Sequence, residues 1–559
     1  MKFNLLSLTG ILAILIFPLI SQSQSINWYQ QNRSSDTPYN LGTDEVYEKI
    51  LNKKIGNPVI VAVIDSGVDI EHEDLKDVIW VNQDEIPDNG IDDDENGYVD
   101  DVNGWNFIGG PNGEQVGGDT YEMTRHYKEL RTKYNDADPS KLKGEELEEY
   151  NTFIKYGKRI DSEVKKARSQ YKGFEEKYQV FEDVVNHIEN IEEVHPINKD
   201  LLDSLSTSFN PNDAFAANIF NFYLEQTGEL PSSKELRKEL LGPLEEGLNY
   251  FGSKFKYNWN PDFDPRHLVG DNYNDPHERY YGNNLVEGPD AMHGTHVSGI
   301  IAASRNNTIG INGIAENVRI MPVRAVPDGD ERDKDVANAI RYAVENGASI
   351  INMSFGKGAS PYKEVVDDAI RFAEKNDVLI VHAAGNSSEN LDEAENYPSD
   401  QFKNPKGFLF WKKKKAKNYI SVGASAPSTG QDMVAEFSNY GTEDVDIFAP
   451  GVMILSTVPD NEYEVSQGTS MAAPVVSGVA AILRSHFPTL TAEQVKEALM
   501  TSTQPVDTMV LKPGSKEEVP FSSLSVSGGI IDLAAAYSVA SRMKGKKKLK
   551  SGKSGKTRA

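Results

Sequence analysis

The stretch Val59-Ile-Val-Ala-Val-Ile-Asp65 is an apolar run of strand length that ends in a carboxylate. Similar continuous apolar runs recur along the chain, at 349–353, 378–382 and 419–422. Helical patterns lie between them, at 335–345 and 361–375. Because strands without polar alternation are buried on both faces, the pattern predicts an α/β fold with a mainly parallel β-sheet and helices on both faces.

Two polar residues follow these runs closely. Asp65 ends the first run, and Asn386 comes just after the run that closes near His382. In parallel sheets covered by helices, the chemistry collects beyond the carboxyl ends of the strands. Both residues are therefore candidates for a site at this edge of the predicted sheet.

Four short segments together supply the groups that an acyl-transfer reaction needs. Each alone is weak, because Asp after a strand is often a helix cap and Gly-Thr-Ser is a common loop. Jointly they provide an orienter, a base, an amide donor and a nucleophile, in the chain order Asp, His, Ser that some serine hydrolases use. The segments are Val61-Ala-Val-Ile-Asp65-Ser-Gly67, His293-Gly-Thr-His-Val-Ser-Gly299, Ala383-Ala-Gly-Asn386 and Gly468-Thr-Ser470-Met-Ala-Ala-Pro474.

These segments resemble the motifs of the subtilisin-like serine peptidases, the subtilases. Further matches follow in the same order, at Asn307-Thr-Ile-Gly310, Ser354-Phe-Gly356, Phe437-Ser-Asn-Tyr-Gly441 and Phe448-Ala-Pro-Gly451. The resemblance implies a subtilisin-like fold and an acyl-enzyme on Ser470, with His293 as general base and acid. It also implies that Asp65 orients the imidazole, and that the Asn386 amide and the Ser470 N–H bind the oxyanion.

The resemblance further implies which segments bind the substrate. Both Ser354–Gly356 and Ala383–Gly385 would flank the pocket for the residue before the cut, and Ser354, Phe355 and Gly356 would also add the peptide as an extra strand. The second segment consists of Ala383, Ala384 and Gly385. The lysine-rich stretch 408–417 departs from the family near that pocket. A solvated surface loop is the favoured interpretation of this stretch, and selection of acidic substrates is the alternative.

An acidic segment predicts a calcium site. Oxygen-bearing side chains fall at positions 1, 3, 5 and 9 of an EF-hand-type loop, and Gly97 stands at position 6. The expected ligands are Asp92, Asp94, Asn96, Tyr98 through its carbonyl, and Asp100. Asn103 replaces the usual Glu at position 12, so Asp101 may close the loop, and an acidic surface turn is the alternative interpretation. By resemblance, a second calcium site would use Asp74 and Asn307.

Residues 116–264 interrupt the strand–helix pattern. From Ile160 to Ile188 apolar residues recur at alternating steps of four and three, which places one apolar seam along a helix. A shorter seam from Met123 to Tyr134 is the expected antiparallel partner. We therefore predict an all-α helical-hairpin insertion, a surface on which a partner could dock, between catalytic parts 25–115 and 265–541.

The two ends of the sequence and its charge indicate the compartment. A positive start and an apolar run from Leu5 to Ile20 predict a signal peptide at 1–24, and hence an extracellular or periplasmic protein without a transmembrane anchor after cleavage. The tail 542–559 carries nine Lys or Arg and no acidic residue. The whole chain has a net charge of −27, which argues against nucleic acid as a partner. It contains no cysteine, so bound metal rather than disulfides is expected to add rigidity.

The expected function is a secreted serine endopeptidase that acts on proteins or peptides. One alternative is a catalytically silent scaffold that uses the helical arm, although such a protein would normally have lost a residue of the set Asp65, His293, Ser470 and Asn386. The other alternative is a peptide ligase or macrocyclase, which the sequence does not separate from a hydrolase.

Overall fold

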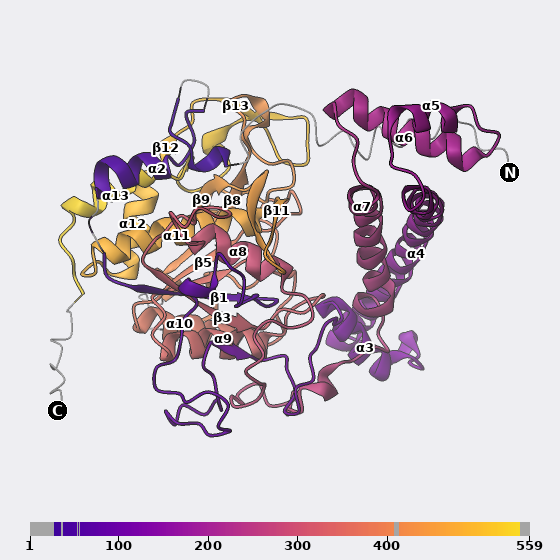
Figure 1. Cartoon of the computed structure of the whole chain (residues 1–559). Helices are drawn as coiled ribbons and strands as arrows, with labels where there is room; N and C mark the ends of the chain where they lie inside the picture. The colour runs from indigo at the N-terminus through magenta and orange to yellow at the C-terminus, as the bar shows by residue number, and fades with distance from the viewer. Residues whose placement is uncertain (1–26, 35–36, 53, 55, 407–412, 548–559) are drawn as a thin grey trace. The chain divides into compact units, whose positions relative to one another are not determined.

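The computed structural model describes residues 27–34, 37–52, 54, 56–406 and 413–547, which form two compact units (Figure 1). One unit is helical and comprises Met123–Phe263. The other contains the described residues up to Glu122 and from Asp264 onward. The predicted signal peptide, residues 407–412 of the lysine-rich stretch and the end of the basic tail lie outside the described residues.

The second unit is built on a nine-stranded sheet, in the order β12-β15-β9-β8-β5-β4-β1-β3-β2. Every neighbouring pair is parallel except β12 with β15. The strands are β1 (Val59–Asp65), β2 (Trp105–Asn106), β3 (Val318–Arg324), β4 (Ile350–Met353), β5 (Leu379–Ala383), β8 (Tyr419–Ser425), β9 (Ile447–Pro450), β12 (Gln504–Pro505) and β15 (Gly529–Ile530). The predicted mainly parallel α/β sheet is confirmed.

Small antiparallel pairs and helices complete this unit. The pairs are β6 (Gln401–Lys406) with β7 (Lys413–Lys415), β10 (Ile454–Val458) with β11 (Glu462–Ser466), and β13 (Met509–Leu511) with β14 (Glu518–Pro520). The helices are α2 (Thr43–Glu45), α8 (Met292–Ala302), α9 (Asp333–Glu345), α10 (Lys363–Lys375), α11 (Thr469–His486), α12 (Ala492–Thr501) and α13 (Leu533–Arg542). No helix among the described residues has the length and apolarity needed to cross a membrane.

Helices cover both faces of the sheet, as the apolar runs predicted (Figure 1). Val61 and Val63 of β1 belong to the apolar cluster that includes α8, α11, α12 and α13. Ala62 and Ile64, on the opposite face of the same strand, belong to the cluster that includes α9 and α10. Because successive side chains of a strand point to opposite faces, a run without polar residues fills both cores at once.

The strand order brings three polar positions to one edge. β1 lies beside β4, and β4 lies beside β5, all parallel and in register. Asp65 is the last residue of β1, Ser354 follows β4 directly, and Asn386 comes three residues after β5. The carboxyl ends of these adjacent strands therefore present side chains from sequence positions more than 300 residues apart.

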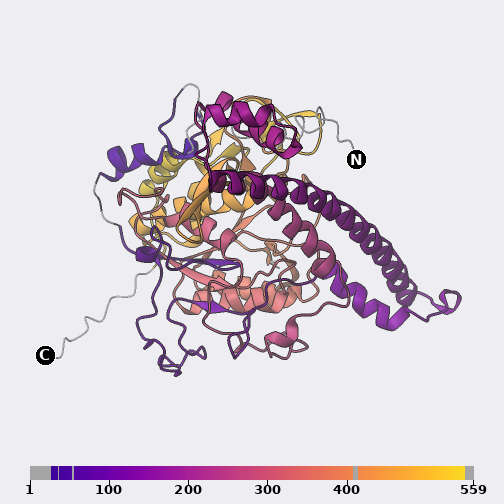
Figure 2. The ribbon, with the colours of Figure 1, turned by 45° about the vertical axis from the view of Figure 1, so that its right-hand side comes forward.

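The helical unit contains one long helix and four shorter ones. They are α3 (Glu122–Tyr134), α4 (Glu145–Glu192), α5 (Lys199–Ser206), α6 (Pro211–Thr227) and α7 (Ser233–Ser253). Figure 2 shows α4 as one continuous helix. At about 1.5 Å per residue, its 48 residues span about 72 Å.

The apolar seam of α4 is buried along much of its length. Ile160, Ala167, Phe181, Val185 and Ile188 are all buried, and the last three belong to a core shared with α5, α6 and α7. The expected partner α3 does pack antiparallel against the start of α4, where Tyr127 stacks on Phe153 at 5.3 Å between ring centroids. The main partner is nevertheless α7, so the insertion is larger than a two-helix hairpin.

Candidate active site

Asp65 and His293 form the first half of the site. The Asp65 carboxylate accepts a 2.7 Å hydrogen bond from His293 Nδ1 and a 2.8 Å bond from the Ser66 N–H. His293 stands in the first turn of α8, and the next residue, Gly294, lies against the backbone of Gly67. A Cβ at Gly294 would come within 2.1 Å of the Gly67 carbonyl oxygen, so only glycine allows this close approach of helix and strand end.

The surroundings of His293 favour its protonated form. Burial by itself lowers the pKa of the imidazole, but the charge and hydrogen bond of Asp65, with the charge of Asp290, outweigh burial and raise it. Asp65 is only 2% exposed, so its charge acts on the imidazole with little screening by water. A base with a raised pKa binds a proton well, which suits a group that accepts one during attack.

Ser470 is the second residue of α11, where the helix dipole favours a developing negative charge. Its hydroxyl donates a 3.0 Å hydrogen bond to the Ser354 carbonyl, and the Ser354 hydroxyl donates a 2.8 Å bond to the Ser470 carbonyl. In the part of the chain that the structure describes, no hydrogen bond joins Ser470 to His293. Proton transfer to His293 therefore requires the Ser470 hydroxyl to turn away from Ser354.

Asn386 is oriented by hydrogen bonds to its side-chain oxygen. The Asn386 Oδ1 accepts from the N–H and the hydroxyl of Thr469, both at 2.9 Å, so its amide nitrogen faces the other way. A Cβ built on Gly468 would lie 3.4 Å from the Asn386 Nδ2 and 3.6 Å from the Ser470 N. Both nitrogens thus lie close to Gly468, at the start of α11.

Asn439 fixes the loop that carries Asn386. Its side-chain oxygen accepts from the N–H groups of Ser387 at 3.0 Å and Glu389 at 2.9 Å. Its side-chain nitrogen donates 2.9 Å to the Ala384 carbonyl. These bonds tie both sides of Asn386 to one buried residue, so the loop is held before any ligand arrives.

The two predicted substrate walls differ in their free hydrogen-bonding groups. Gly385 is saturated, because its N–H donates to the Thr469 hydroxyl and its carbonyl accepts from the Asn439 N–H. Gly356 is exposed, and within the described ranges its N–H and carbonyl make no hydrogen bond. An exposed backbone segment with unused donor and acceptor can pair with an added strand.

Asn396 lies between these walls. Its Nδ2 donates 3.0 Å to the Ala384 carbonyl, and a Cβ placed on Gly356 would come within 2.6 Å of its Oδ1. The side chain of Asn396 therefore fills the space between the two segments and contacts both.

Three of the four described lysines of the stretch 408–417 are paired with acidic residues. Lys413 contacts Glu374, Lys415 contacts Asp444 at 2.6 Å, and Lys417 contacts Glu493 at 2.8 Å. This pairing supports the interpretation as a surface feature over one that attracts acidic substrates.

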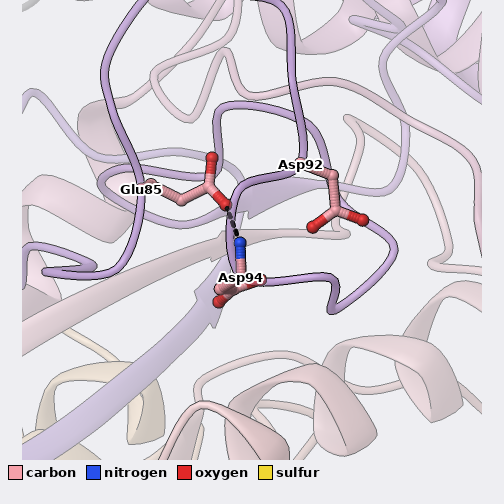
Figure 3. Close-up of side chains that lie close together, drawn as sticks. All are labelled: Glu85, Asp92 and Asp94. Atoms are coloured by element: carbon pink, nitrogen blue, oxygen red, sulfur yellow. Dashed lines mark hydrogen bonds between the residues drawn. The ribbon is translucent and has the colours of Figure 1, made fainter.

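The acidic loop brings three carboxylates together, as Figure 3 shows for Glu85, Asp92 and Asp94. One oxygen from each lies within 4.8 Å of the others. Glu85 Oε1 accepts from the Asp94 N–H at 3.2 Å, while its buried Oε2 has no hydrogen-bond partner among the described residues. Burial raises the pKa of Glu85, and the charges of Asp94 and Asp93 raise it further, against hydrogen bonds that lower it.

The other predicted loop ligands have different environments. Asn96 Nδ2 donates to Asp94 at 3.0 Å and to Asp101 at 3.1 Å, and Asp101 also accepts from Asn82 and from the Tyr342 hydroxyl. Asp100 accepts from the N–H groups of Asn89 and Gly90 instead of joining the three carboxylates. The Tyr98 ring is buried, and its N–H donates to the Asn96 side chain at 2.8 Å.

Asp74 and Asn307, the pair expected at a second metal site, are in contact. Asn307 Nδ2 donates 2.6 Å to one oxygen of Asp74. The other oxygen accepts from the Ile311 N–H at 3.0 Å and from the Tyr463 hydroxyl at 3.4 Å. Both oxygens of this fully buried carboxylate are thus engaged by donors from the protein.

Sequence reasoning missed four residues of these sites: Glu85, Asn396, Asn439 and Thr469. Asn439 and Thr469 stand inside motifs that were recognised, so asking what each motif side chain bonds to would have found them. Glu85 precedes the EF-hand-like pattern, and Asn396 lies outside every recognised motif.

Comparison with known proteins identifies one family. A family model described as the subtilase family matches residues 56–521. A thermophilic serine proteinase of Bacillus sp. (strain AK1) is 41% identical over 196 residues, which covers 35% of this chain and 43% of that protein. Subtilisin DY of Bacillus licheniformis is 36% identical over 214 residues, covering 38% and 69%. The matched part is thus less than half the length of the first of these relatives.

Solved structures show similar matches. A protease from Pseudoalteromonas arctica has 29% identity and a TM-score of 0.36, covering 46% of this chain and 74% of that chain. The prenylagaramide maturation protease PagA has 29% identity and a TM-score of 0.34, covering 44% of this chain and 82% of that one.

Proposed function

Because the chain belongs to the subtilase family, we propose that it is a serine endopeptidase that hydrolyses peptide bonds through an acyl-enzyme on Ser470. The observation that carries this proposal is the arrangement around Ser470. The Asn386 amide nitrogen and the Ser470 backbone nitrogen both lie close to Gly468, and His293 is hydrogen-bonded to the buried Asp65 at the same strand edge. A scaffold that had lost catalysis would have no need to keep this set oriented.

The reaction follows from these positions. Ser470 Oγ turns from the Ser354 carbonyl, gives its proton to His293 Nε2 and attacks the substrate carbonyl carbon. The carbonyl oxygen becomes an oxyanion that accepts hydrogen bonds from Asn386 and the Ser470 N–H. His293 then protonates the leaving amine, and Asp65 stabilises the imidazolium without taking the proton. Water, deprotonated by His293, releases the acyl group from Ser470.

Substrate peptides are proposed to pair with the open segment Ser354–Gly356. The free N–H and carbonyl of Gly356 support this, because they match the hydrogen-bonding pattern of an added strand. Backbone pairing accepts many sequences, so the substrate class is extended polypeptide. Ala383–Gly385 would form the second wall, with Asn396 between the two.

Digestion of a peptide library, with mass spectrometry of the products, tests the proposal. We expect cleavage products with new free termini from the wild-type chain and none from Ser470→Ala. Products joined end to end would instead identify a ligase, and cleavage that survives in Ser470→Ala would refute the assignment.

We also propose that calcium binds the acidic loop at Glu85, Asp92 and Asp94. Calcium takes six to eight oxygen ligands, and carboxylates and carbonyls are its usual donors. The support is the unpartnered, buried Glu85 Oε2 beside two further carboxylates. Asn96 and the Tyr98 carbonyl belong to the proposed loop, whereas Asp100 is engaged by backbone N–H groups. A second proposed site uses Asp74 and Asn307, supported by their direct contact.

Export is proposed from the predicted signal peptide at 1–24. The expected location is extracellular or periplasmic. N-terminal sequencing of the protein recovered outside the cytoplasm should give a start near residues 23–25. A mature protein that retains Met1 would contradict cleavage.

The helical unit is proposed to filter substrates or to bind a partner. Its support is an independent core formed by α4, α5, α6 and α7, which a simple surface loop would not have. Replacing 123–263 by a Gly/Ser linker tests the role. If the shortened enzyme is folded and keeps the same preference between folded and unfolded substrates, the unit has no gating function.

A further inference from the structure

Five consecutive charged residues are buried where α9 begins. The charged run, Glu331-Arg332-Asp333-Lys334-Asp335, has exposed fractions between 0% and 3%. Charges removed from water are costly unless each is paired with an opposite charge and hydrogen-bonded. The partners of the charged run are therefore strong structural constraints on the segments that carry them.

Those partners come from both ends of the helical insertion. Arg332 donates to Asp119 at 2.8 and 3.1 Å, and Asp119 precedes the insertion. Asp335 accepts from Arg266 at 2.6 and 2.9 Å, and Arg266 follows it. The chain thus leaves for the helical unit and returns from it at the same buried turn.

Lys357 connects this turn to the open substrate wall. Its Nζ donates 2.8 Å to Glu122 Oε2 and 2.8 Å to the Glu331 carbonyl, and lies 2.9 Å from Asp333. The side chain of Lys357 is 1% exposed. Lys357 directly follows Gly356 in the chain, and its own backbone N–H donates to the Tyr397 carbonyl at 3.0 Å.

We infer that Lys357 is a positioning residue for the substrate wall Ser354–Gly356, and that its bond to Glu122 joins this wall to the root of the helical insertion. The inference rests on the proposed endopeptidase function. Ser354 contacts the nucleophile through its carbonyl, and Gly356 offers the unused backbone groups. An anchored Lys357 fixes the far end of this three-residue segment, so the wall is ordered before the peptide binds.

The expected consequence depends on substrate length. A peptide with several residues before the cut pairs with the wall. It binds more tightly when the wall is already ordered, because no binding energy is then spent on ordering the wall. A single blocked amino-acid ester lacks the residues that pair with the wall as a strand, and meets the wall only beside the pocket for the residue before the cut. Loosening Lys357 should therefore raise KM for the long substrate much more than KM for the short one.

The experiment compares a blocked tetrapeptide anilide with a blocked amino-acid ester that has the same residue before the cut. Each rate is divided by the concentration of active sites, titrated with a fluorophosphonate. The variants are Lys357→Gln, Glu122→Gln and the double variant, in the full chain. Lys334→Gln is the matched control, because Lys334 is 1% exposed and pairs with Asp271 and Glu278 in the same turn without contacting Lys357.

For Lys357→Gln we expect about a tenfold rise in KM for the tetrapeptide, on the scale of one charge-assisted hydrogen bond, and less than about a twofold rise for the ester. Glu122→Gln should raise that KM about threefold, since Asp333 still holds Lys357. The double variant should match Lys357→Gln, because the same bond is lost in both. Lys334→Gln should change the melting temperature and leave the ratio of the two substrates within about twofold.

Equal losses on both substrates, or the same length dependence in Lys334→Gln, would overturn the positioning role. If the two single substitutions multiplied their effects on the tetrapeptide KM in the double variant, the link between Lys357 and Glu122 would be overturned. If Lys357→Gln does not fold, the comparison of Glu122→Gln with Lys334→Gln decides. A wild-type chain that takes up no fluorophosphonate and cleaves neither substrate would instead refute the endopeptidase itself.

Discussion

The acidic loop and the charged run both gather carboxylates, but they differ in where the balancing cations come from. Around the charged run, Arg266, Arg332, Lys334 and Lys357 form ion pairs with buried aspartates of the chain. Burial raises the pKa of the remaining acid, Glu331, to about 8, so that it carries little charge at neutral pH. In the acidic loop, Glu85, Asp92 and Asp94 have no Lys or Arg ion-pair partner within the described ranges. The first cluster therefore balances its aspartates within the chain, whereas for the second we propose a cation from solution.

The Asp65–His293 pair resembles the charged run, because a side chain of the protein, the His293 imidazole, balances the buried Asp65 carboxylate. It differs from the charged run because its cation forms only when His293 is protonated. The three clusters therefore respond to different treatments: pH for the pair, substitution for the charged run, and chelation for the acidic loop.

The largest effect is expected for Asp65→Asn. Loss of the orienting carboxylate should lower kcat by roughly 10⁴-fold, as in other Ser-His-Asp triads. Neutral His293 is the active base, and Asp65 raises its pKa, so wild-type kcat/KM should fall as pH drops through that raised value. Without Asp65, burial dominates and the acidic limb should move to lower pH. A pH–rate profile whose acidic limb stays at the same pH would show that Asp65 does not control the pKa of His293.

The next effect concerns stability of the charged run. Arg266→Met leaves Asp271 and Asp335 without their guanidinium, and both carboxylates are fully buried. Breaking a buried pair from one side costs about 3–5 kcal/mol. Denaturant unfolding in the Ser470→Ala background, which prevents self-digestion, should show this loss equally with calcium and with chelator. If added calcium restored the lost unfolding free energy, the charged run would depend on calcium as the acidic loop is proposed to do, and the contrast between the two clusters would be wrong.

The smaller effect concerns the acidic loop. Calcium at a hundredfold excess over its dissociation constant should stabilise the fold by about 2.7 kcal/mol. Chelation should therefore lower the melting temperature by several degrees and speed self-digestion of the wild-type chain. Asp92→Ala with Asp94→Ala, or Glu85→Gln, should reproduce much of the loss and blunt the response to calcium. Identical melting curves with chelator and with millimolar calcium would mean that the loop is a solvated turn.

The strands were predictable because their signal is local. A run such as Val59–Ile64 is uniformly apolar only when both faces are buried, so β1, β4, β5 and β8 could be found from residue type alone. The edge position of Asp65 and Asn386 then followed from the parallel arrangement. The signal for α4 was equally local, since the spacing of the residues in its apolar seam specifies a helix with one buried face.

The partner of that seam was not local. Spacing alone predicts the nearest apolar segment, α3, as the partner, whereas α7 begins more than 40 residues beyond the end of α4. Gly242, Pro243 and Gly247 weaken the helical signal of α7. Gly247 is nevertheless a contact point, because a Cβ there would lie 2.2 Å from the Phe174 ring. Glycine lowers the intrinsic stability of α7 as a helix, but at this position it allows α7 to pack closely against α4.

The same limit explains the missed site residues. Asn396, Asn439 and Thr469 act by bonding to segments distant in sequence, so their roles depend on a fold that spacing does not reveal. The buried charged run was also unexpected, because five charges in a row are typical of an exposed surface. Its burial depends on partners such as Arg266 and Asp119, which are 69 and 213 residues away in the sequence.

The most direct test of the account is the site of covalent attack by a fluorophosphonate, mapped by mass spectrometry on the full chain. The account predicts one phosphonyl group on Ser470, absent in Ser470→Ala and slowed strongly in His293→Ala because the base is lost. It further predicts that chelation reduces labelling only as far as it unfolds the chain. A phosphonyl group on any other residue, or labelling that persists in Ser470→Ala, would contradict the assignment of Ser470 as the nucleophile.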